Sequence, residues 1–155
     1  MPHSRRDLLC VAAGGALLLS PSLLLAQRLL TPSQTLGPFF PDRLPLDSDN
    51  DLLQVAGHPQ PARGLAVQLY GQVLNVSGRP LAGALVEIWQ VDAEGIYLHS
   101  RGGDRARRDS GFQGYGHTRT DGAGRYRFRT IRPVPYPGRT PHIHMAVSLP
   151  GQPRF

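Results

Sequence analysis

The feature that most constrains the fold is a series of short apolar or alternating segments separated by turns rich in glycine and proline. Residues 125–131, Arg-Tyr-Arg-Phe-Arg-Thr-Ile, alternate strictly and predict a strand with Tyr126 and Phe128 facing inward and the arginines facing outward. Gly71 is a candidate for a β-bulge. Further strands are predicted at residues 65–76, 84–91, 114–120 and 142–149. Since no segment favours a helix, the chain is expected to be all-β, an antiparallel β-sandwich.

Residues 1–26 differ in character from the rest of the chain. Paired arginines near the start precede an apolar run from Cys10 to Leu19, and small residues follow it. This order is typical of an export signal, and the paired arginines favour the twin-arginine route to the periplasm. A membrane anchor is the alternative, but Pro21 interrupts the run short of the about 20 apolar residues that a spanning helix needs. No stable membrane span is therefore expected after signal removal.

The remaining chain divides into an arm and a core. Residues 27–64 are rich in Pro, Asp and Leu without clear periodicity, and they predict an extended N-terminal arm. Residues 65–155 are expected to form the β-sandwich. The one cysteine, Cys10, falls in the export signal, so no disulfide is expected in the mature chain. The formal net charge of +6 comes from scattered arginines, which argues against nucleic-acid binding and favours small anionic substrates.

The residues with the most chemical potential lie near the end of the chain. His142 and His144 are two positions apart on a predicted strand, so they would share one face. Tyr136 precedes them, and Tyr97 lies upstream. Phenols and imidazoles together suit a hard, polarising ion such as Fe(III), because a free phenol has a pKa near ~10. The opposite face of this strand is expected to be core, with Ile143, Met145, Val147 and Leu149.

Ordinary roles for these residues are the alternative. A His-x-His pair on a strand is more often a surface or packing feature than a metal site. Tyr136 lies between two prolines, where tyrosines commonly anchor loops. Periodicity alone does not tie Tyr97 to the pair.

Several segments, taken in order, carry a family resemblance. They are residues 31–40 (TPSQTLGPFF), 78–97, 112–116 and 120–133, followed by Tyr136-Pro137 and His142-Ile143-His144. In this order they resemble the intradiol ring-cleavage dioxygenases, the family of protocatechuate 3,4-dioxygenase and catechol dioxygenase. The likeness covers residues 31–150, nearly all of the predicted mature chain.

The resemblance implies a non-haem Fe(III) held by Tyr97, Tyr136, His142 and His144. It implies that Tyr136 also acts as a base and that Arg139 stabilises negative charge on a bound catecholate. The implied reaction inserts both atoms of O2 into a catechol-type substrate and opens the ring between the hydroxyls to a muconate-type diacid. Association into a homo- or hetero-oligomer is left open.

The chain departs from the family pattern in two places. It ends soon after His144, where family members usually continue with strands that complete the sandwich and with a glutamine near the iron, so an incomplete sandwich is expected. His117 stands where relatives commonly have arginine, and a surface position is the expected role. One alternative is a non-catalytic metal- or ligand-binding sandwich derived from the family. Another is a zinc hydrolase, but this sequence has no third histidine or carboxylate near the cluster, as such a site would need.

Overall fold

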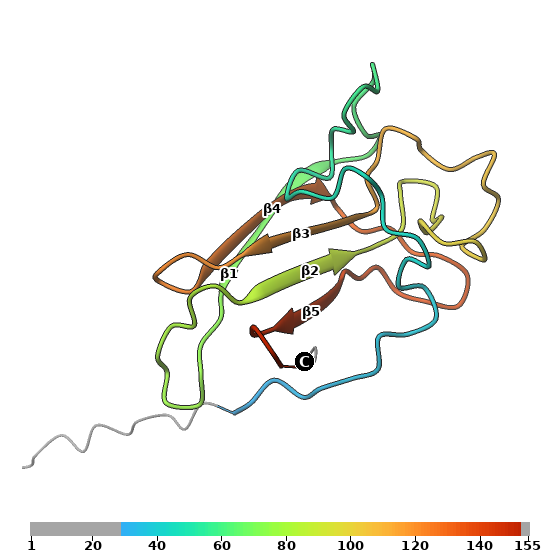
Figure 1. Ribbon diagram of the computed structural model, residues 1–155. Helices are drawn as coiled ribbons and strands as arrows, with labels where there is room; N and C mark the ends of the chain where they lie inside the picture. The colour runs from blue at the N-terminus through green and yellow to red at the C-terminus, as the bar shows by residue number, and fades with distance from the viewer. Residues whose placement is uncertain (1–28, 153–155) are drawn as a thin grey trace, which may run out of the picture.

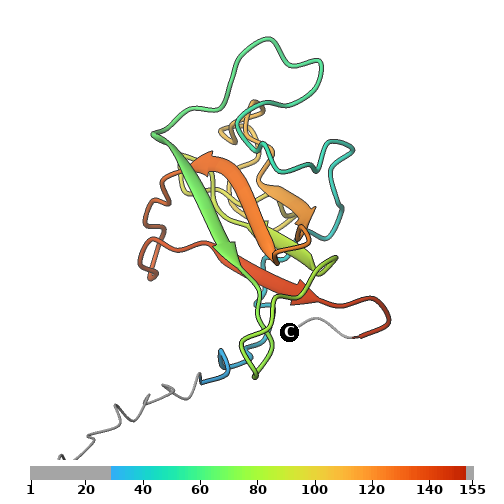
Figure 2. The ribbon, with the colours of Figure 1, turned by 90° about the vertical axis from the view of Figure 1, so that its left-hand side faces the viewer.

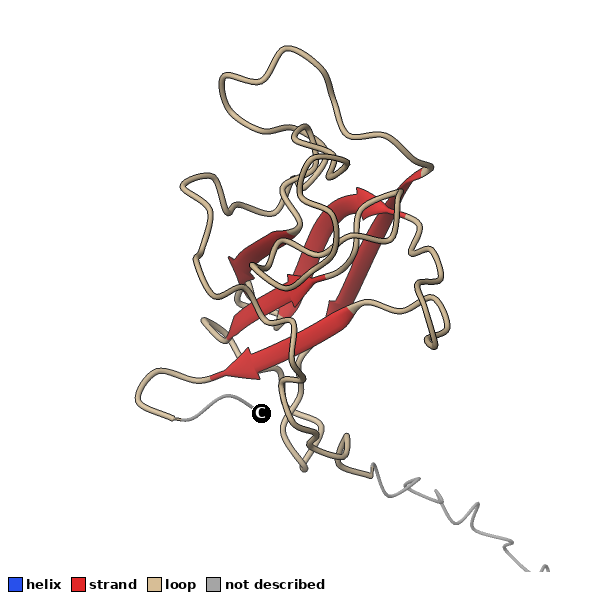
Figure 3. Cartoon of the chain, turned by 90° about the vertical axis from the view of Figure 1, so that its right-hand side faces the viewer, coloured by secondary structure: helices blue, strands red, loops and turns tan. Residues whose placement is uncertain are grey.

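The computed structural model describes residues 29–152, which contain five β-strands and no helix (Figure 3). The strands are β1 (Ala66–Gln72), β2 (Leu85–Trp89), β3 (Tyr115–Arg119), β4 (Arg125–Ile131) and β5 (His144–Ser148). The all-β fold predicted from the sequence is therefore confirmed. The predicted export signal lies outside the described residues. The described part of the chain has no helix of the length and apolarity needed to cross a membrane.

The strands form two antiparallel sheets. One sheet pairs β1 with β4, and the other has the order β3-β2-β5. Figure 2 shows the β1–β4 pair (green and orange) set at an angle to β5 (red). The loop that follows β2 and the loop that precedes β5 lie at the same end of the sheets (Figure 1). This end of the fold carries the candidate site.

The main core lies between the two sheets. Val86 and Ile88 of β2 belong to the same core cluster as Phe128 and Ile131 of β4, and all four side chains are fully buried. Burying each of these side chains stabilises the fold by about 1.5–3 kcal/mol. The alternation predicted for residues 125–131 is confirmed, since Phe128 is buried and the three arginines of β4 are exposed.

The last strand differs from its prediction. β5 begins at His144, so His142 lies in the loop before it. Met145 was expected in the core but is 39% exposed, whereas Ala146 is 1% exposed. β5 is an outer strand of its sheet, and the Tyr126 hydroxyl lies 3.7 Å from the Met145 sulfur. Ile143 and Val147, which were predicted on the same face, do pack against the main core. The other face of β5 is covered by aromatic side chains that the sequence did not indicate.

Two further details correct the strand predictions. Gly71 forms no bulge, because it pairs in register with Tyr126. A side chain at position 71 would collide with the Tyr126 ring, so the glycine allows that ring to lie across β1. The strands predicted at residues 65–76, 84–91 and 114–120 are longer than the observed β1, β2 and β3.

The segment before β1 contains no strand among residues 29–64, yet part of it belongs to the core. Leu52 is fully buried against the main core, and its N–H donates to the Arg129 carbonyl at 2.8 Å. Figure 1 shows this segment (blue to teal) running past β5 toward the loop end of the sheets. It thereby reaches the candidate site as well as the core.

Candidate metal centre

Four side chains predicted as metal ligands converge at the loop end of the sheets. Tyr97 comes from the loop after β2, Tyr136 and His142 come from the loop before β5, and His144 is the first residue of β5. The Tyr97 Oη lies 3.0 Å from the His144 Nε2, and 3.4 Å from both the His142 Nε2 and the Tyr136 Oη. The two histidine Nε2 atoms are 3.2 Å apart. The structure therefore brings all four together, although residues of three different segments supply them.

The donor set fits a hard metal ion. Atoms separated by 3.0–3.4 Å are spaced as ligands are when each lies about 2 Å from one shared ion. Two imidazole nitrogens and two phenol oxygens match a ferric ion better than a soft one. The described residues contain no group of three or more His, Cys, Asp or Glu side chains suited to a metal. The zinc hydrolase alternative thus gains no support from this part of the chain.

Burial and neighbouring charges shift the pKa values of two residues in the cluster, His144 and Tyr97. Burial, together with the nearby His142 and Arg139, lowers the pKa of His144 to about 4. Burial raises the pKa of Tyr97 above its usual range, and the neighbouring Tyr136 raises it further, while Arg139 has a smaller opposite effect. At neutral pH the imidazole of His144 has a free lone pair, whereas the phenol of Tyr97 still holds its proton.

Fe(III) uptake by the metal-free protein is expected to strengthen as pH rises. Each phenol that binds must release its proton, so the affinity should increase about tenfold per pH unit for each proton released. Because the pKa of His144 is about 4, protonation of this imidazole does not oppose binding above that pH. Competition with a chelator at several pH values, corrected for the chelator's own protonation, measures the slope. An affinity independent of pH would contradict phenolate ligation.

The loop that carries Tyr97 is held by a buried carboxylate. Asp92 is 1% exposed, and its Oδ1 accepts hydrogen bonds from the N–H groups of Glu94 and Ile96 at 2.9 and 3.0 Å. Its Oδ2 accepts from the Asp109 N–H at 2.7 Å. A buried carboxylate needs such donors, and here they fix the turn that leads directly to Tyr97.

A tight turn places Arg139 beside Tyr136. Gly138 has a φ of +75°, and Pro137 precedes it, which is the pattern of a type II turn. The turn is closed by the Arg139 N–H, which donates to the Tyr136 carbonyl at 2.9 Å. Arg139 is exposed and has no ion-pair partner among residues 29–152. Its guanidinium is therefore available to an anionic ligand.

Aromatic rings enclose the cluster. Phe39, from the N-terminal segment, stacks on Tyr97 with ring centroids 4.8 Å apart, and its ring lies edge-on to Tyr136 at 6.4 Å. Trp89 of β2 stacks on His144 at 4.9 Å. Neither residue is predicted from the sequence to belong to the site. The signal for Phe39 was present in the segment TPSQTLGPFF, whereas Trp89 required knowledge of how β2 pairs with β5.

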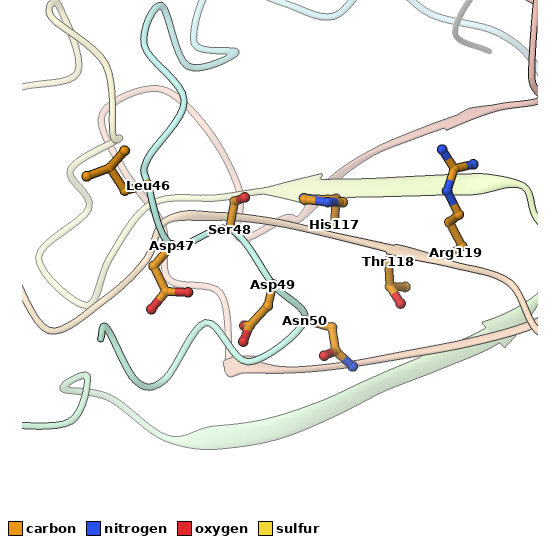
Figure 4. Close-up of a pocket in the computed structure, with 8 residues that line it drawn as sticks. All are labelled: Leu46, Asp47, Ser48, Asp49, Asn50, His117, Thr118 and Arg119. Carbon is orange, nitrogen blue, oxygen red and sulfur yellow. The ribbon is translucent and has the colours of Figure 1, made fainter. Parts of the chain in front are cut away.

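A shallow cavity elsewhere on the molecule does not contribute to this cluster. It has a volume of about 570 Å³ and lies between the N-terminal segment and β3 (Figure 4). His117 lines it and is exposed, as predicted for a surface position. The carboxylates of Asp47 and Asp49 accept hydrogen bonds from the N–H groups of Ala56 and Asp51. These aspartates therefore hold the shape of their own segment.

Comparison with known proteins identifies the family. A family model described as "Dioxygenase" matches residues 35–153. The beta chain of protocatechuate 3,4-dioxygenase from Burkholderia cepacia is 39% identical over 106 residues, which are 64% of this chain and 45% of that relative. Hydroxyquinol 1,2-dioxygenase from Corynebacterium glutamicum is 32% identical over 139 residues, which are 77% of this chain and 42% of the relative. The chain belongs to the intradiol ring-cleavage dioxygenase family.

Solved structures agree with this assignment. The dioxygenase domain of a dioxygenase carbohydrate-binding protein fusion from Streptomyces sp. SirexAA-E superposes with a TM-score of 0.61 and 33% sequence identity, covering 80% of this chain and 70% of that one. The resemblance found in the sequence is thereby confirmed at the level of the family. This intradiol dioxygenase-family chain spans less than half the length of the first curated relatives that it matches.

Proposed function

We propose that this chain is the Fe(III)-binding part of an intradiol dioxygenase that opens a catechol-type ring to a muconate-type diacid. The observation that carries the proposal is the convergence of two phenols and two imidazoles at 3.0–3.4 Å in a chain of this family. A ferric ion bound there would withdraw electron density from a catecholate and make its ring reactive toward O2. The protein's own contribution is to hold the ligands, accept protons and bind the substrate's charge.

The four ligands have different freedom to move. Tyr97 is 2% exposed and lies under Phe39, so it is suited to remain a fixed ligand. Tyr136 is only half-buried and lies in a loop. We assign Tyr136 as the base, because a Tyr136 phenolate that has lost its proton on binding the metal could take up a proton from a substrate hydroxyl. His142 and His144 remain as neutral imidazole ligands.

Replacing Tyr97 or Tyr136 with phenylalanine is expected to change the visible colour of the iron-loaded protein. Each phenolate contributes charge-transfer absorption to Fe(III), so removing one should shift or weaken the band. The visible spectrum of each variant, scaled to its iron content, measures the effect. As a control, Tyr70→Phe alters an exposed tyrosine of β1 and should leave the band unchanged. An unaltered band in both ligand variants would contradict their assignment.

Arg139→Ala is expected to retain iron but to slow turnover by about 10²-fold or more, as the loss of one preorganised charge-stabilising donor typically does. The guanidinium lies close enough to Tyr97 and His144 to affect the pKa of both, and it is free to meet a catecholate. Steady-state O2 consumption, with iron measured on the same sample, tests this role. Arg79→Ala, which changes an arginine in the turn after β1, is the control. Unchanged kinetics in the Arg139 variant would remove its catalytic role.

The reaction itself is tested by supplying ¹⁸O2 with a panel of catechols to the iron-loaded full chain. The proposal predicts a ring-opened diacid that carries two ¹⁸O atoms, formed by cleavage between the hydroxyls. Iron uptake without O2 consumption would instead support a non-catalytic binding module derived from the family. Cleavage beside the hydroxyls would contradict the intradiol reaction.

Export and assembly are further parts of the proposal. We infer from the sequence of residues 1–26 that the chain is exported to the periplasm by the twin-arginine route. Both the alpha and the beta chain of protocatechuate 3,4-dioxygenase from Burkholderia cepacia are similar to this chain, which supports association into an oligomer. Fractionation of cells with the paired arginines changed to lysine tests the route, and light scattering of the purified chain tests the assembly.

A further inference from the structure

The two histidines of the cluster are held in different ways. The Nδ1 of His142 lies 2.6 Å from the Thr140 carbonyl, so a hydrogen bond fixes its ring and leaves Nε2 free to face the cluster. His144 has no such bond at Nδ1 among residues 29–152, because the polar contacts that the structure gives it are all made by Nε2. Its ring plane must therefore be set by packing.

Trp89 stacks face-to-face on His144, whereas the His142 ring meets it edge-on and the Tyr97 ring is tilted. The Trp89 and His144 rings are nearly parallel, with an interplanar angle of 2° and centroids 4.9 Å apart. They meet because Trp89 and His144 are directly opposite each other where β2 pairs with β5. Opposite residues of an antiparallel pair extend from the same face of the sheet, so the stack follows from the strand register.

The indole of Trp89 is itself held tightly, yet its polar group is unused. The side chain is 2% exposed, and Phe40 meets it edge-on at 5.0 Å. Its N–H has no hydrogen-bond partner in the described part of the chain. An unpaired buried donor destabilises a fold, so hydrogen bonding gives no reason to prefer tryptophan over phenylalanine here. The size and shape of the indole relative to His144 supply a reason.

We propose that Trp89 is a positioning residue for His144. The flat indole restricts rotation of the imidazole and directs its Nε2 toward the point shared by the four donors. It thus does for His144 what the Thr140 carbonyl does for His142. The inference rests on the proposed iron site, since the orientation matters only when the imidazole binds a metal. Groups that orient a metal ligand typically change metal affinity 10–100-fold when they are lost.

The test compares Trp89→Leu, which removes the stack, with Trp89→Phe, which retains a smaller flat ring. Phe128→Leu is the matched control, because it also reduces a fully buried aromatic but lies in the main core away from the cluster. For each full-length protein, the rate of Fe(III) release to a chelator and the position and width of the charge-transfer band are measured. We expect Trp89→Leu to release iron about 10–100-fold faster with a shifted or broadened band. Trp89→Phe should lie between it and the wild type, and Phe128→Leu should match the wild type.

Two results would overturn the proposal. One is iron release and a band in Trp89→Leu that equal those of the wild type. The other is an equal acceleration in Trp89→Leu and Phe128→Leu, which would show a general loss of stability.

A measurement on the metal-free protein separates this inference from the proposed function. Side-chain NMR signals of His144 should be single and narrow in the wild type but broadened or doubled in Trp89→Leu, while those of His142 stay unchanged. If no form binds iron, the proposed function fails, and these signals still decide whether Trp89 orients the ring. Identical His144 signals in both proteins would reject the orienting role.

Discussion

Protein in which His142 is replaced by alanine is expected to purify with little or no iron. The change removes one of the four proposed ligands, and a water molecule that takes its place binds the ion less firmly than the imidazole. Loss of a group that merely orients a ligand weakens a metal site about 10–100-fold, so loss of the ligand itself should weaken it more. Iron analysis and the visible spectrum of the purified variant measure the result.

The control for this experiment is another histidine of the same chain. His117 on β3 is exposed and lines the shallow cavity rather than the cluster. His117→Ala should therefore retain both iron and colour. Normal iron content in the His142 variant would contradict the ligand assignment, because removing a true ligand must weaken the site.

Replacing Asp92 with alanine is expected to lower the free energy of unfolding by about 3 kcal/mol or more. The variant leaves the N–H groups of Glu94, Ile96 and Asp109 without their acceptor, and each unsatisfied buried donor costs about 1–3 kcal/mol. Urea unfolding of the metal-free protein measures the loss. Because these bonds fix the turn before Tyr97, the variant should also bind iron more weakly.

Asp121→Ala provides a matched control for the Asp92 variant. The Asp121 carboxylate also accepts two backbone hydrogen bonds, from Ala123 and Arg125, but in an exposed turn. Water can replace these bonds, so the loss should be about 1 kcal/mol. Asp92→Asn should lose an amount of stability between these two values. The amide oxygen can still accept hydrogen bonds on one side, but the amide NH2 meets a backbone N–H on the other side and cannot accept from it. Equal losses for Asp92→Ala and Asp121→Ala would show that burial of Asp92 does not matter.

The sequence predicted best the strands that have one buried face and one exposed face. Residues 125–131 form β4 with the expected bounds because the sheet has one buried face and one exposed face, which strict alternation describes well. β5 is less simple, since Ala146 packs among aromatic rings while Met145 lies near an outer edge. Hydrophobic alternation predicts which face of a strand points to the core, and Ile143 and Val147 confirm that face. It does not show which positions the neighbouring elements cover, and so the exposure of Met145 was not predicted.

The candidate site was also only partly predictable from hydrophobic periodicity. Strand periodicity suggested that His142 and His144 share a face, but His142 lies in a loop and is directed by the Thr140 carbonyl. Tyr97 was placed near them only through the family resemblance. Its actual position depends on the hydrogen bonds of Asp92, which involve a loop distant in sequence. Such contacts are set by tertiary packing and leave no periodic signal in the chain.

The measurement that tests the account most directly is a visible absorption spectrum of the purified protein, taken before and after anaerobic addition of catechol, with iron quantified on the same sample. The account predicts a tyrosinate-to-Fe(III) charge-transfer band that shifts when catechol binds. A colourless protein that cannot be reconstituted with iron would contradict it.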